Sequence, residues 1–137
     1  MITFVVPGEA RGKQRARTVR NGSHTYTPKE TLLAENQIAW YCREAMKAAE
    51  VLRLEGPVLL EFAALYNHPA SWSKKKKAAA FWKTTKPDLD NIEKLLKDAL
   101  NGVAWIDDAQ IAGVVKMKRY LDDSDKARLV ETIKALS

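Results

Sequence analysis

The sequence has only one cysteine, Cys42, among its 137 residues, which excludes an intrachain disulfide and fits a reducing compartment. The two histidines, His24 and His68, have no partner residues at zinc-binding spacing, so we expect no zinc. A glycine-rich phosphate loop is missing, which argues against nucleotide hydrolysis and a nucleotide cofactor. No apolar run is long enough to cross a bilayer, and the N-terminus has the pattern of a first strand rather than of a signal peptide. We therefore expect a cytoplasmic protein without a membrane partner.

Aspartate is missing from most of the chain, since every aspartate lies at position 88 or later. Residues 1–86 contain 15 lysines and arginines against 7 glutamates, whereas residues 87–137 contain 8 basic and 10 acidic residues. The basic part indicates a polyanionic partner. Aspartates gathered in an otherwise basic protein favour a metal site, because hard carboxylate oxygens suit Mg²⁺ or Mn²⁺. Composition alone leaves ordinary surface charge as the alternative.

The order of apolar patterns predicts one α+β domain over residues 1–137, with a small mixed β-sheet and helices packed on it. Strands are expected at 2–6, 58–66, 111–121 and 127–136, and helices at 28–51, from about 73, and at 90–101. Residues 8–27 are expected to form a loop or an irregular hairpin. A polar turn at 122–125 predicts that the last two strands form a hairpin.

The few aromatic and sulfur side chains are expected to have packing roles. Trp40 and Trp105 are predicted core residues, and Cys42 is expected to be buried and inert. Residues predicted to join the core or a contact between subunits, with stacking on DNA bases as the alternative, are Trp72, Phe81 and Trp82.

The segment 86–91 carries the strongest chemical signal. Pro87 keeps the residue before it extended, and side chains two positions apart then point the same way. Asp88 and Asp90 are therefore predicted to share a face, where two close carboxylates need a cation between them. Lys94 lies one helical turn after Asp90, so we expect its ammonium to reach the same site, beside a metal-bound phosphate.

A third acid has to come from outside this segment. Asp107 and Asp108 precede a predicted strand, and we expect them to return to the start of the helix. Adjacent side chains point in different directions, so one of the two is expected to be a ligand, and spacing does not say which. On spacing alone, an equal alternative is a capping box formed by Asp90 and Glu93, with a plain turn at Asp107 and Asp108.

Four cations recur at every second position of the N-terminal loop: Arg11, Lys13, Arg15 and Arg17. In an extended segment all four would face one way and form a track for DNA phosphates. We favour this over a solvated loop, because four cations on one face repel each other without an anion. The lysine run at 74–77 is instead expected to be a solvated helix start.

Considered as one pattern, most of the chain resembles a known family. The central matching residues are Lys86-Pro87-Asp88-Leu89-Asp90-Asn91, Lys94, Asp98-Ala99-Leu100-Asn101-Gly102, Trp105, Asp107-Asp108-Ala109-Gln110 and Lys116. Pro7 and the basic segment from Gly12 to Arg17 are similar to the opening of the same family. The pattern is similar to that of the endodeoxyribonuclease RusA family, the RusA-type Holliday junction resolvases, which are common in bacteria and their phages.

The resemblance implies a homodimer that resolves four-way junction DNA by paired symmetric nicks in DNA recombination and repair. It implies Mg²⁺ as the cofactor, with Mn²⁺ as an expected substitute. Asp88, Asp90 and Asp108 are the implied metal ligands, and together with Lys94 they form the implied catalytic set. The resemblance therefore selects Asp108 over Asp107, which spacing did not.

The supporting residues that the resemblance implies are Asn91, Asp98 and Asp107, and Lys116 is expected to contact DNA. Two other functions stay open. A DNA-binding module without catalysis explains the basic part of the chain but leaves the aspartates without a role. A metal-dependent nuclease with another branched substrate or an RNA substrate has the same acidic site, so cleavage tests on different substrates separate it from a resolvase.

Overall fold

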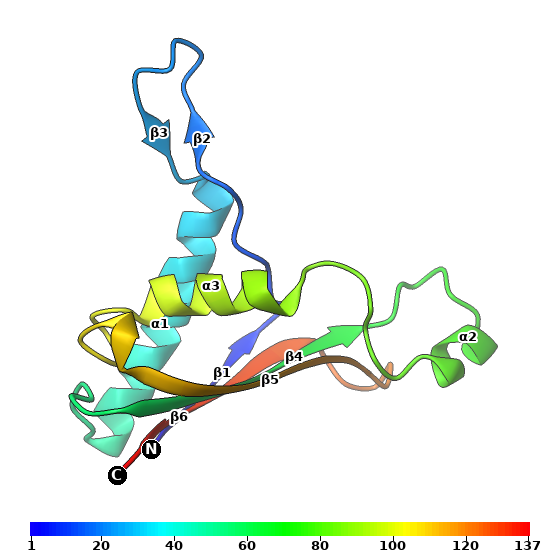
Figure 1. Ribbon diagram of the computed structural model, residues 1–137. Helices are drawn as coiled ribbons and strands as arrows, with labels where there is room; N and C mark the ends of the chain where they lie inside the picture. Colours follow the sequence, from blue (N-terminus) through cyan, green and yellow to red (C-terminus); the bar gives the residue numbers. More distant parts are fainter.

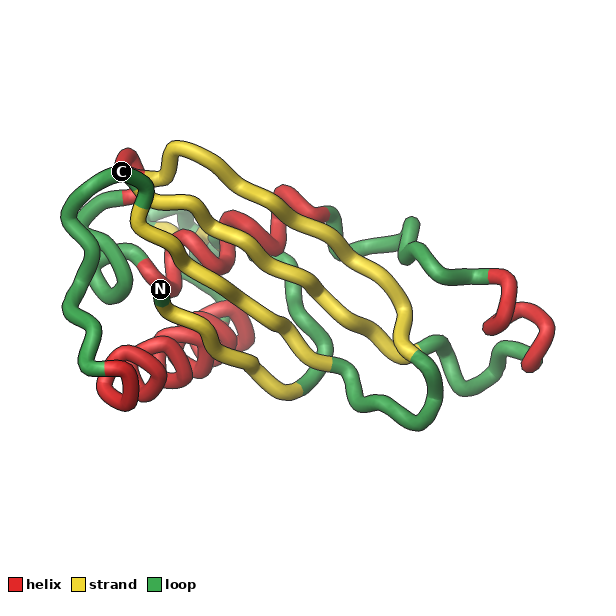
Figure 2. Tube along the Cα trace, turned by 90° about the horizontal axis from the view of Figure 1, so that it is seen from below, coloured by secondary structure: helices red, strands yellow, loops and turns green.

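Two long helices lie across one face of a four-stranded β-sheet, and the opposite face carries no helix (Figures 1 and 2). The computed structural model describes residues 1–137. Its elements are β1 (Ile2–Pro7), β2 (Arg17–Thr18), β3 (Thr25–Tyr26), α1 (Lys29–Ala49), β4 (Val58–Asn67), α2 (Lys74–Ala79), α3 (Leu89–Leu100), the short 3₁₀ helix η1 (Asp108–Gln110), β5 (Ile111–Leu121) and β6 (Arg128–Ala135). The predicted α+β fold is confirmed. None of the helices has the length and apolar character needed to span a membrane.

Alternating apolar residues build the core between the sheet and the two long helices. In β1, the side chains of Ile2, Phe4 and Val6 are buried while those of their neighbours are exposed, which is the pattern of a strand with one covered face. The helix α3 adds one continuous apolar stripe, made of Ile92, Leu95, Leu96, Ala99 and Leu100. This packing fixes α3 on the sheet, and it therefore fixes the positions of the polar residues at both ends of the helix.

The strand order in the main sheet is β1-β6-β4-β5, with β4 and β5 parallel. Parallel neighbours need a long connection, and here it contains α2 and α3. The predicted hairpin of the last two strands is wrong, because β5 and β6 lie on opposite sides of β4. The turn between them crosses the end of β4, where the Asn67 side chain donates to Asp125 O at 2.8 Å and accepts from Ala127 N at 3.0 Å.

The long helix α1 begins after Pro28 and ends at Ala49, and the next residue, Glu50, has a left-handed φ of 55°. Cys42 is fully buried, and burial raises the pKa of its thiol to about 12, which keeps it protonated and unreactive as expected. Trp105 is fully buried, as predicted. Trp40 is 54% exposed, so its predicted place in the core is wrong, because it lies outside the buried face of α1.

The connection between β4 and α3 is irregular except for α2, as predicted. Ser73 caps this helix, since its hydroxyl accepts from Lys76 N at 3.1 Å. Trp72 packs against the core and its ring lies beside those of His68 and Tyr120. This aromatic cluster anchors the connection to the end of β5, so that the chain beyond α2 runs back toward α3.

Candidate functional site

The aspartates of the segment 86–91 lie at the start of α3. Asp88 is the N-cap residue with an extended backbone (φ −69°, ψ 148°), and Asp90 belongs to the first helical turn. Leu89 packs against the core, whereas both aspartates are exposed. The predicted alternative of a capping box made by Asp90 and Glu93 is not formed, because Asp88 holds the N-cap position and no side chain caps α3.

Lys116 on β5 neutralises this acidic helix start. Its Nζ donates to Asp90 Oδ1 and to Glu93 Oε1, both at 2.7 Å. The hydrogen bond from Lys116 lowers the pKa of Asp90, and the bonds to Asp90 and Glu93 raise the pKa of Lys116. Burial raises the pKa of Glu93, but hydrogen bonds from Lys116 and Lys97 outweigh burial and the net pKa is lowered. Lys116, which was predicted to contact DNA, is thus held within the chain by two carboxylates.

A second lysine of β5 holds the segment that leads into α3. Lys118 lies two residues after Lys116 and therefore on the same face of the strand. Its Nζ donates to Thr85 O at 2.6 Å and to Pro87 O at 2.9 Å. Sequence reasoning missed Lys118, although two lysines at alternate positions of a predicted strand were a usable signal.

The basic N-terminal loop packs directly against the same helix start. Gly12 lies so close to α3 that a Cβ atom there would stand 3.0 Å from Pro87 Cβ and 3.1 Å from Asn91 Cβ. Lys13 N donates to Asn91 O at 3.0 Å, and the Lys13 ammonium pairs with Asp98. Asn91 and Asp98, which were predicted to support the site, therefore hold the loop in place.

The predicted phosphate track along this loop is only partly formed. Lys13 turns back to α3, whereas Arg11, Arg15 and Arg17 are exposed. The prediction that all four cations face one way is therefore wrong, because the loop is fixed by its contacts with α3 and is not a regular extended strand between residues 8 and 16. The three arginines remain predicted DNA contacts.

Replacing Gly12 by alanine is expected to lower cleavage activity without unfolding the chain. The new Cβ would stand closer to Pro87 and Asn91 than ordinary carbon contacts, so the loop has to shift by a few tenths of an ångström relative to the aspartates. A misplacement of about 1 Å at an active site lowers turnover by roughly 100-fold, so this smaller shift is expected to lower it by up to about 10-fold. The measurement is single-turnover cleavage together with the melting temperature. Gly56→Ala is the matched control, because nothing lies within 4 Å of a Cβ there; equal activity of the two variants would contradict the role given to the loop.

Asp107 and Asp108 lie beyond the other end of α3. Asp107 caps η1, since its Oδ2 accepts from Ala109 N at 3.1 Å and its own N–H donates to Gln110 Oε1 at 2.9 Å. The buried Trp105 donates its Nε1–H to Asp108 Oδ1 at 2.8 Å and so orients one oxygen of that carboxylate. Each of the two aspartates thus has one carboxylate oxygen engaged within the chain, and the choice of Asp108 over Asp107 still rests on the family resemblance.

The two groups of aspartates are separated by the length of α3. This helix has 12 residues, or about 18 Å at 1.5 Å per residue, and β5 runs back along it to Lys116 (Figure 1). The prediction that the segment with Asp108 returns to the start of the helix is wrong. Gln110 ties that segment to the entrance of β4, because its Nε2 donates to Leu54 O and Gly56 O, both at 2.9 Å.

A single chain does not assemble the three-aspartate metal site that the resemblance implies. No group of three or more carboxylate, histidine or cysteine side chains within the chain is placed to hold a metal ion. Asp88 and Asp90 have the oxygen ligands that Mg²⁺ prefers, but one oxygen of Asp90 is already bound by Lys116. Two aspartates at one end of α3 and one at the other therefore leave the implied ligand set incomplete.

Basic and aromatic side chains surround the start of α3. Lys94 is exposed one turn after Asp90, and its charge contributes to the lowered pKa of Asp90 after the larger effect of Lys116. A polar hollow of about 840 Å³ opens beside Pro87. Its lining includes Arg11, Lys83, Lys86, Tyr66 and Tyr120. The hollow has the mixture of cations and aromatic rings that suits a nucleic acid strand.

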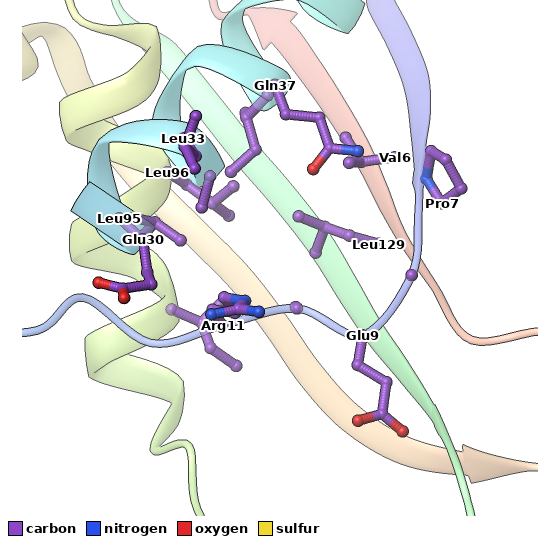
Figure 3. A pocket seen from close by; sticks show the side chains of 15 residues that line it. Val6, Pro7, Glu9, Arg11, Glu30, Leu33, Gln37, Leu95, Leu96 and Leu129 are labelled. Carbon is purple, nitrogen blue, oxygen red and sulfur yellow. The ribbon is translucent and has the colours of Figure 1, made fainter.

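A second, apolar pocket of about 220 Å³ lies between α1, α3 and the loop after β1 (Figure 3). Leu95, Leu96 and Leu129 line it together with the charged side chains of Arg11 and Glu30. None of the aspartates of the candidate site lines this pocket. It results from the packing of the loop over the two helices and is separate from the acidic helix start.

The fold and these residues define a small α+β protein whose exposed acidic helix start is set in a basic surface, an arrangement typical of proteins that act on nucleic acids. The sequence matches the family model of endodeoxyribonuclease RusA over residues 7–131, and the chain belongs to this family. Membership implies endonuclease activity on Holliday junctions. The chain is also 31% identical over 143 residues to a protein of Bacillus subtilis (strain 168) named uncharacterized protein YqaN, with 98% of each chain covered.

Proposed function

We propose that this protein is a metal-dependent endodeoxyribonuclease that resolves four-way DNA junctions by paired symmetric nicks, as a homodimer, in recombination and repair. Family membership supplies the substrate class. The observation that carries the proposal is the exposed pair Asp88 and Asp90 in basic surroundings. Mg²⁺ is the proposed cofactor and Mn²⁺ its substitute, because hard carboxylate oxygens suit both. No nucleotide is required.

The exposed carboxylates favour catalysis over simple DNA binding. Carboxylates next to a DNA-binding surface repel phosphates and weaken binding. A protein that only bound DNA would gain affinity by losing Asp88 and Asp90, whose side chains have no packing role at the surface of α3. The acidic pair is explained when a phosphate has to react there, and a non-catalytic binding module leaves it unexplained.

The proposed reaction is hydrolysis of one phosphodiester bond in each of two strands. A water oxygen bonds to phosphorus in line with the bond to the 3′ oxygen, which breaks as that oxygen takes up a proton. Lys94, exposed one turn after Asp90, is placed to neutralise charge that develops on the phosphate. Lys116 lowers the pKa of Asp90, so this carboxylate stays ionised to a lower pH than an unpaired aspartate.

The DNA backbone is proposed to approach the aspartates through the polar hollow beside Pro87. Arg11, Lys83 and Lys86 line this hollow, and cations at such positions fix the register of the phosphates. Arg15 and Arg17 extend the basic surface on the exposed loop. The aspartates would then meet a phosphate that the surrounding cations have already positioned.

The proposal predicts selective cutting of branched DNA. A fixed four-way junction incubated with Mg²⁺ should receive paired nicks at symmetric positions, whereas linear duplex of the same sequences should stay intact. EDTA should stop the reaction, and Mn²⁺ should restore it. Denaturing gels with each strand labelled in turn measure this. Equal cutting of duplex, flap or RNA substrates would leave a nuclease but remove the junction preference, and tight binding without cutting would support the binding module.

A further inference from the structure

The chain between β4 and α3 forms an arm that projects beyond the end of the sheet (Figures 1 and 2). The α2 arm, residues 68–86, carries the short helix α2 near its tip. No residue of α2 is buried, and a helix without a buried apolar face gains little stability from packing. The hydrophobic core therefore does not explain why this helix is present.

Contacts at its base hold the α2 arm in a fixed direction. The ring of His68 stacks on that of Tyr120 with 4.3 Å between centroids, and His68 Nε2 donates to Ala80 O at 2.7 Å. Lys77 Nζ pairs with Asp123 Oδ2, in the turn after β5, at 2.9 Å. The direction of α2 is thus fixed before a partner binds, and a fixed surface loses less entropy on binding than a flexible one.

Two aromatic residues join the returning part of the arm to β5. Phe81 and Trp82 are 53% and 57% exposed, which excludes the core role predicted for them. The guanidinium of Arg119 lies over the Phe81 ring at 5.1 Å, and Trp82 forms an antiparallel bridge with Arg119. These contacts add to the anchor of the arm and leave the lysines of α2 at its projecting end.

The α2 arm carries positive charge without negative charge. It contains six lysines and no aspartate or glutamate. Of the four lysines in α2, only Lys77 pairs with a carboxylate, and Lys76 lies over the ring of Trp72 at 4.2 Å. Lys74 and Lys75 are exposed and have no acidic partner. Cations gathered in this way repel each other and suit a polyanionic partner.

These lysines also lie where they oppose the stability of their own helix. The first turn of a helix favours acidic side chains, because the backbone N–H groups there carry partial positive charge. The first turn of α2 has no acidic residue, and Lys74, Lys75 and Lys76 directly follow the cap residue Ser73. Solvation, the role predicted for this run from the sequence, leaves the repulsion in place, whereas phosphate groups beside the lysines would remove it.

A basic path connects the α2 arm to the candidate site. Lys83 and Lys86, on the return from α2, line the polar hollow beside Pro87. Lys118 fixes this return segment, since its ammonium donates to Thr85 O and Pro87 O. The hairpin β2–β3 projects from α3 in another direction than the arm (Figure 1). Cations therefore extend from the start of α3 along two separate projections.

We propose that the α2 arm binds duplex DNA beside the cleavage site, with Lys74, Lys75 and Lys76 contacting backbone phosphates of one duplex branch of the junction. This inference rests on the proposed function, which supplies the DNA. Lysine contacts with phosphates carry no sequence information, so the arm adds affinity and fixes the register of any DNA sequence. None of the three lysines lines the hollow beside Pro87, so they are positioning residues that do not touch the reacting phosphate.

Removing two lysines of the arm should weaken DNA binding and reduce its dependence on salt. The variant carries Lys74→Gln and Lys75→Gln, two changes at exposed side chains. Each phosphate contact contributes about 0.9 to the slope of log affinity against log salt, so the slope should become shallower by about 1.8. Affinity should fall by roughly 10- to 100-fold at about 0.1 M salt. Fluorescence anisotropy with a labelled four-way junction in EDTA measures both quantities.

The matched control carries Arg43→Gln and Lys47→Gln, which remove the same charge from exposed positions of α1. The control should keep the wild-type slope and lose little affinity, and both variants should melt like wild type. An arm variant whose affinity and salt dependence match those of the control would overturn the proposal, because its lysines would then act only through net charge.

Crosslinking would locate the contact on the DNA. Cys42 is fully buried and burial raises the pKa of its thiol, so Lys75→Cys provides the one exposed thiol for a photoreactive label. Irradiation of the labelled protein on a junction in EDTA should give adducts at one distance from the junction centre, and Lys47→Cys should give none. Adducts spread evenly along all branches, or no adducts with Lys75→Cys, would overturn the proposal.

These measurements need no cleavage, so they separate this inference from the function on which it rests. If wild-type protein binds the junction through the α2 arm but cuts no DNA in Mg²⁺ or Mn²⁺, the proposed function is wrong and the DNA contact stands. If junctions are cut while the arm variant binds like the control, the function stands and the arm is not a DNA contact.

Discussion

Asp90→Asn is expected to abolish junction cleavage and to leave junction binding and the melting temperature unchanged. The Asp90 side chain is 83% exposed and packs against nothing, and its one partner, Lys116, keeps a second carboxylate in Glu93. Asparagine has the same shape, so the helix start and Lys116 should stay in place. Loss of one group that acts on the reacting phosphate lowers turnover by about 100- to 1,000-fold or more. Single-turnover cleavage in Mg²⁺ and electrophoretic binding in EDTA measure the two effects separately.

Asp122→Asn is the control for the loss of one negative charge. Asp122 lies exposed in the turn between β5 and β6, far along the chain from α3. The Asp122→Asn protein should cleave like wild type, and this result would show that net charge alone does not explain the effect of Asp90→Asn. An Asp90→Asn protein that cuts junctions at the wild-type rate would remove Asp90 from the catalytic set and would leave the DNA-binding module as the better function.

The elements of the fold could be predicted because each is determined by nearby residues. Pro28 starts α1, Ser73 caps α2, and the apolar stripe of α3 repeats at helical spacing. The order of the strands could not be predicted in the same way. A polar turn such as 122–125 suits a hairpin, but it equally allows the chain to cross the end of β4. The contacts that hold the crossing path are made by the distant Asn67.

The candidate site shows the same division between local and distant information. The positions of Asp88 and Asp90 were predictable because residues 87–90 alone place both carboxylates at a helix start. The partner of Asp90 was not, since Lys116 reaches it from a strand 26 residues away. The predicted position of Asp108 was wrong because it also depends on distant residues. The hydrogen bonds from Gln110 to residues before β4 fix the place of η1.

Glu131 is the one core residue whose charge opposes folding. It occupies an inward position of β6, between Phe4 of β1 and Phe62 of β4, and it is fully buried. Neither of its carboxylate oxygens has a hydrogen-bond partner. Burial therefore raises the pKa of Glu131 to about 8. The strand alternation of Leu129, Glu131 and Ile133 could have revealed a carboxyl group at a core position, and the sequence analysis missed it.

The stability of the protein is therefore expected to fall as pH rises from about 4.5 to about 8. The folded pKa lies above the unfolded value, so the folded state binds the extra proton in this window. The stability gained by keeping Glu131 protonated is present in full below its unfolded pKa of 4.5, and it is lost as pH rises through its folded pKa of about 8. One unit of pKa difference corresponds to about 1.4 kcal/mol, and the total is on the order of a few kcal/mol.

Glu131→Gln should remove this pH dependence, and Glu131→Leu should raise the melting temperature at every pH, because it also removes the unpaired polar group. At pH 9 the leucine variant should melt at least about 5 °C above wild type. Thermal melting between pH 4 and pH 9 measures the effect. Glu61→Gln is the matched control on the helix-free face, where the carboxylate pairs with Lys134 at 3.2 Å and is partly exposed, so little change is expected. If the Glu131→Gln protein kept the wild-type dependence of melting temperature on pH, another group would have to cause that dependence. The buried carboxyl of Glu131 would then have a hydrogen-bond partner in solution.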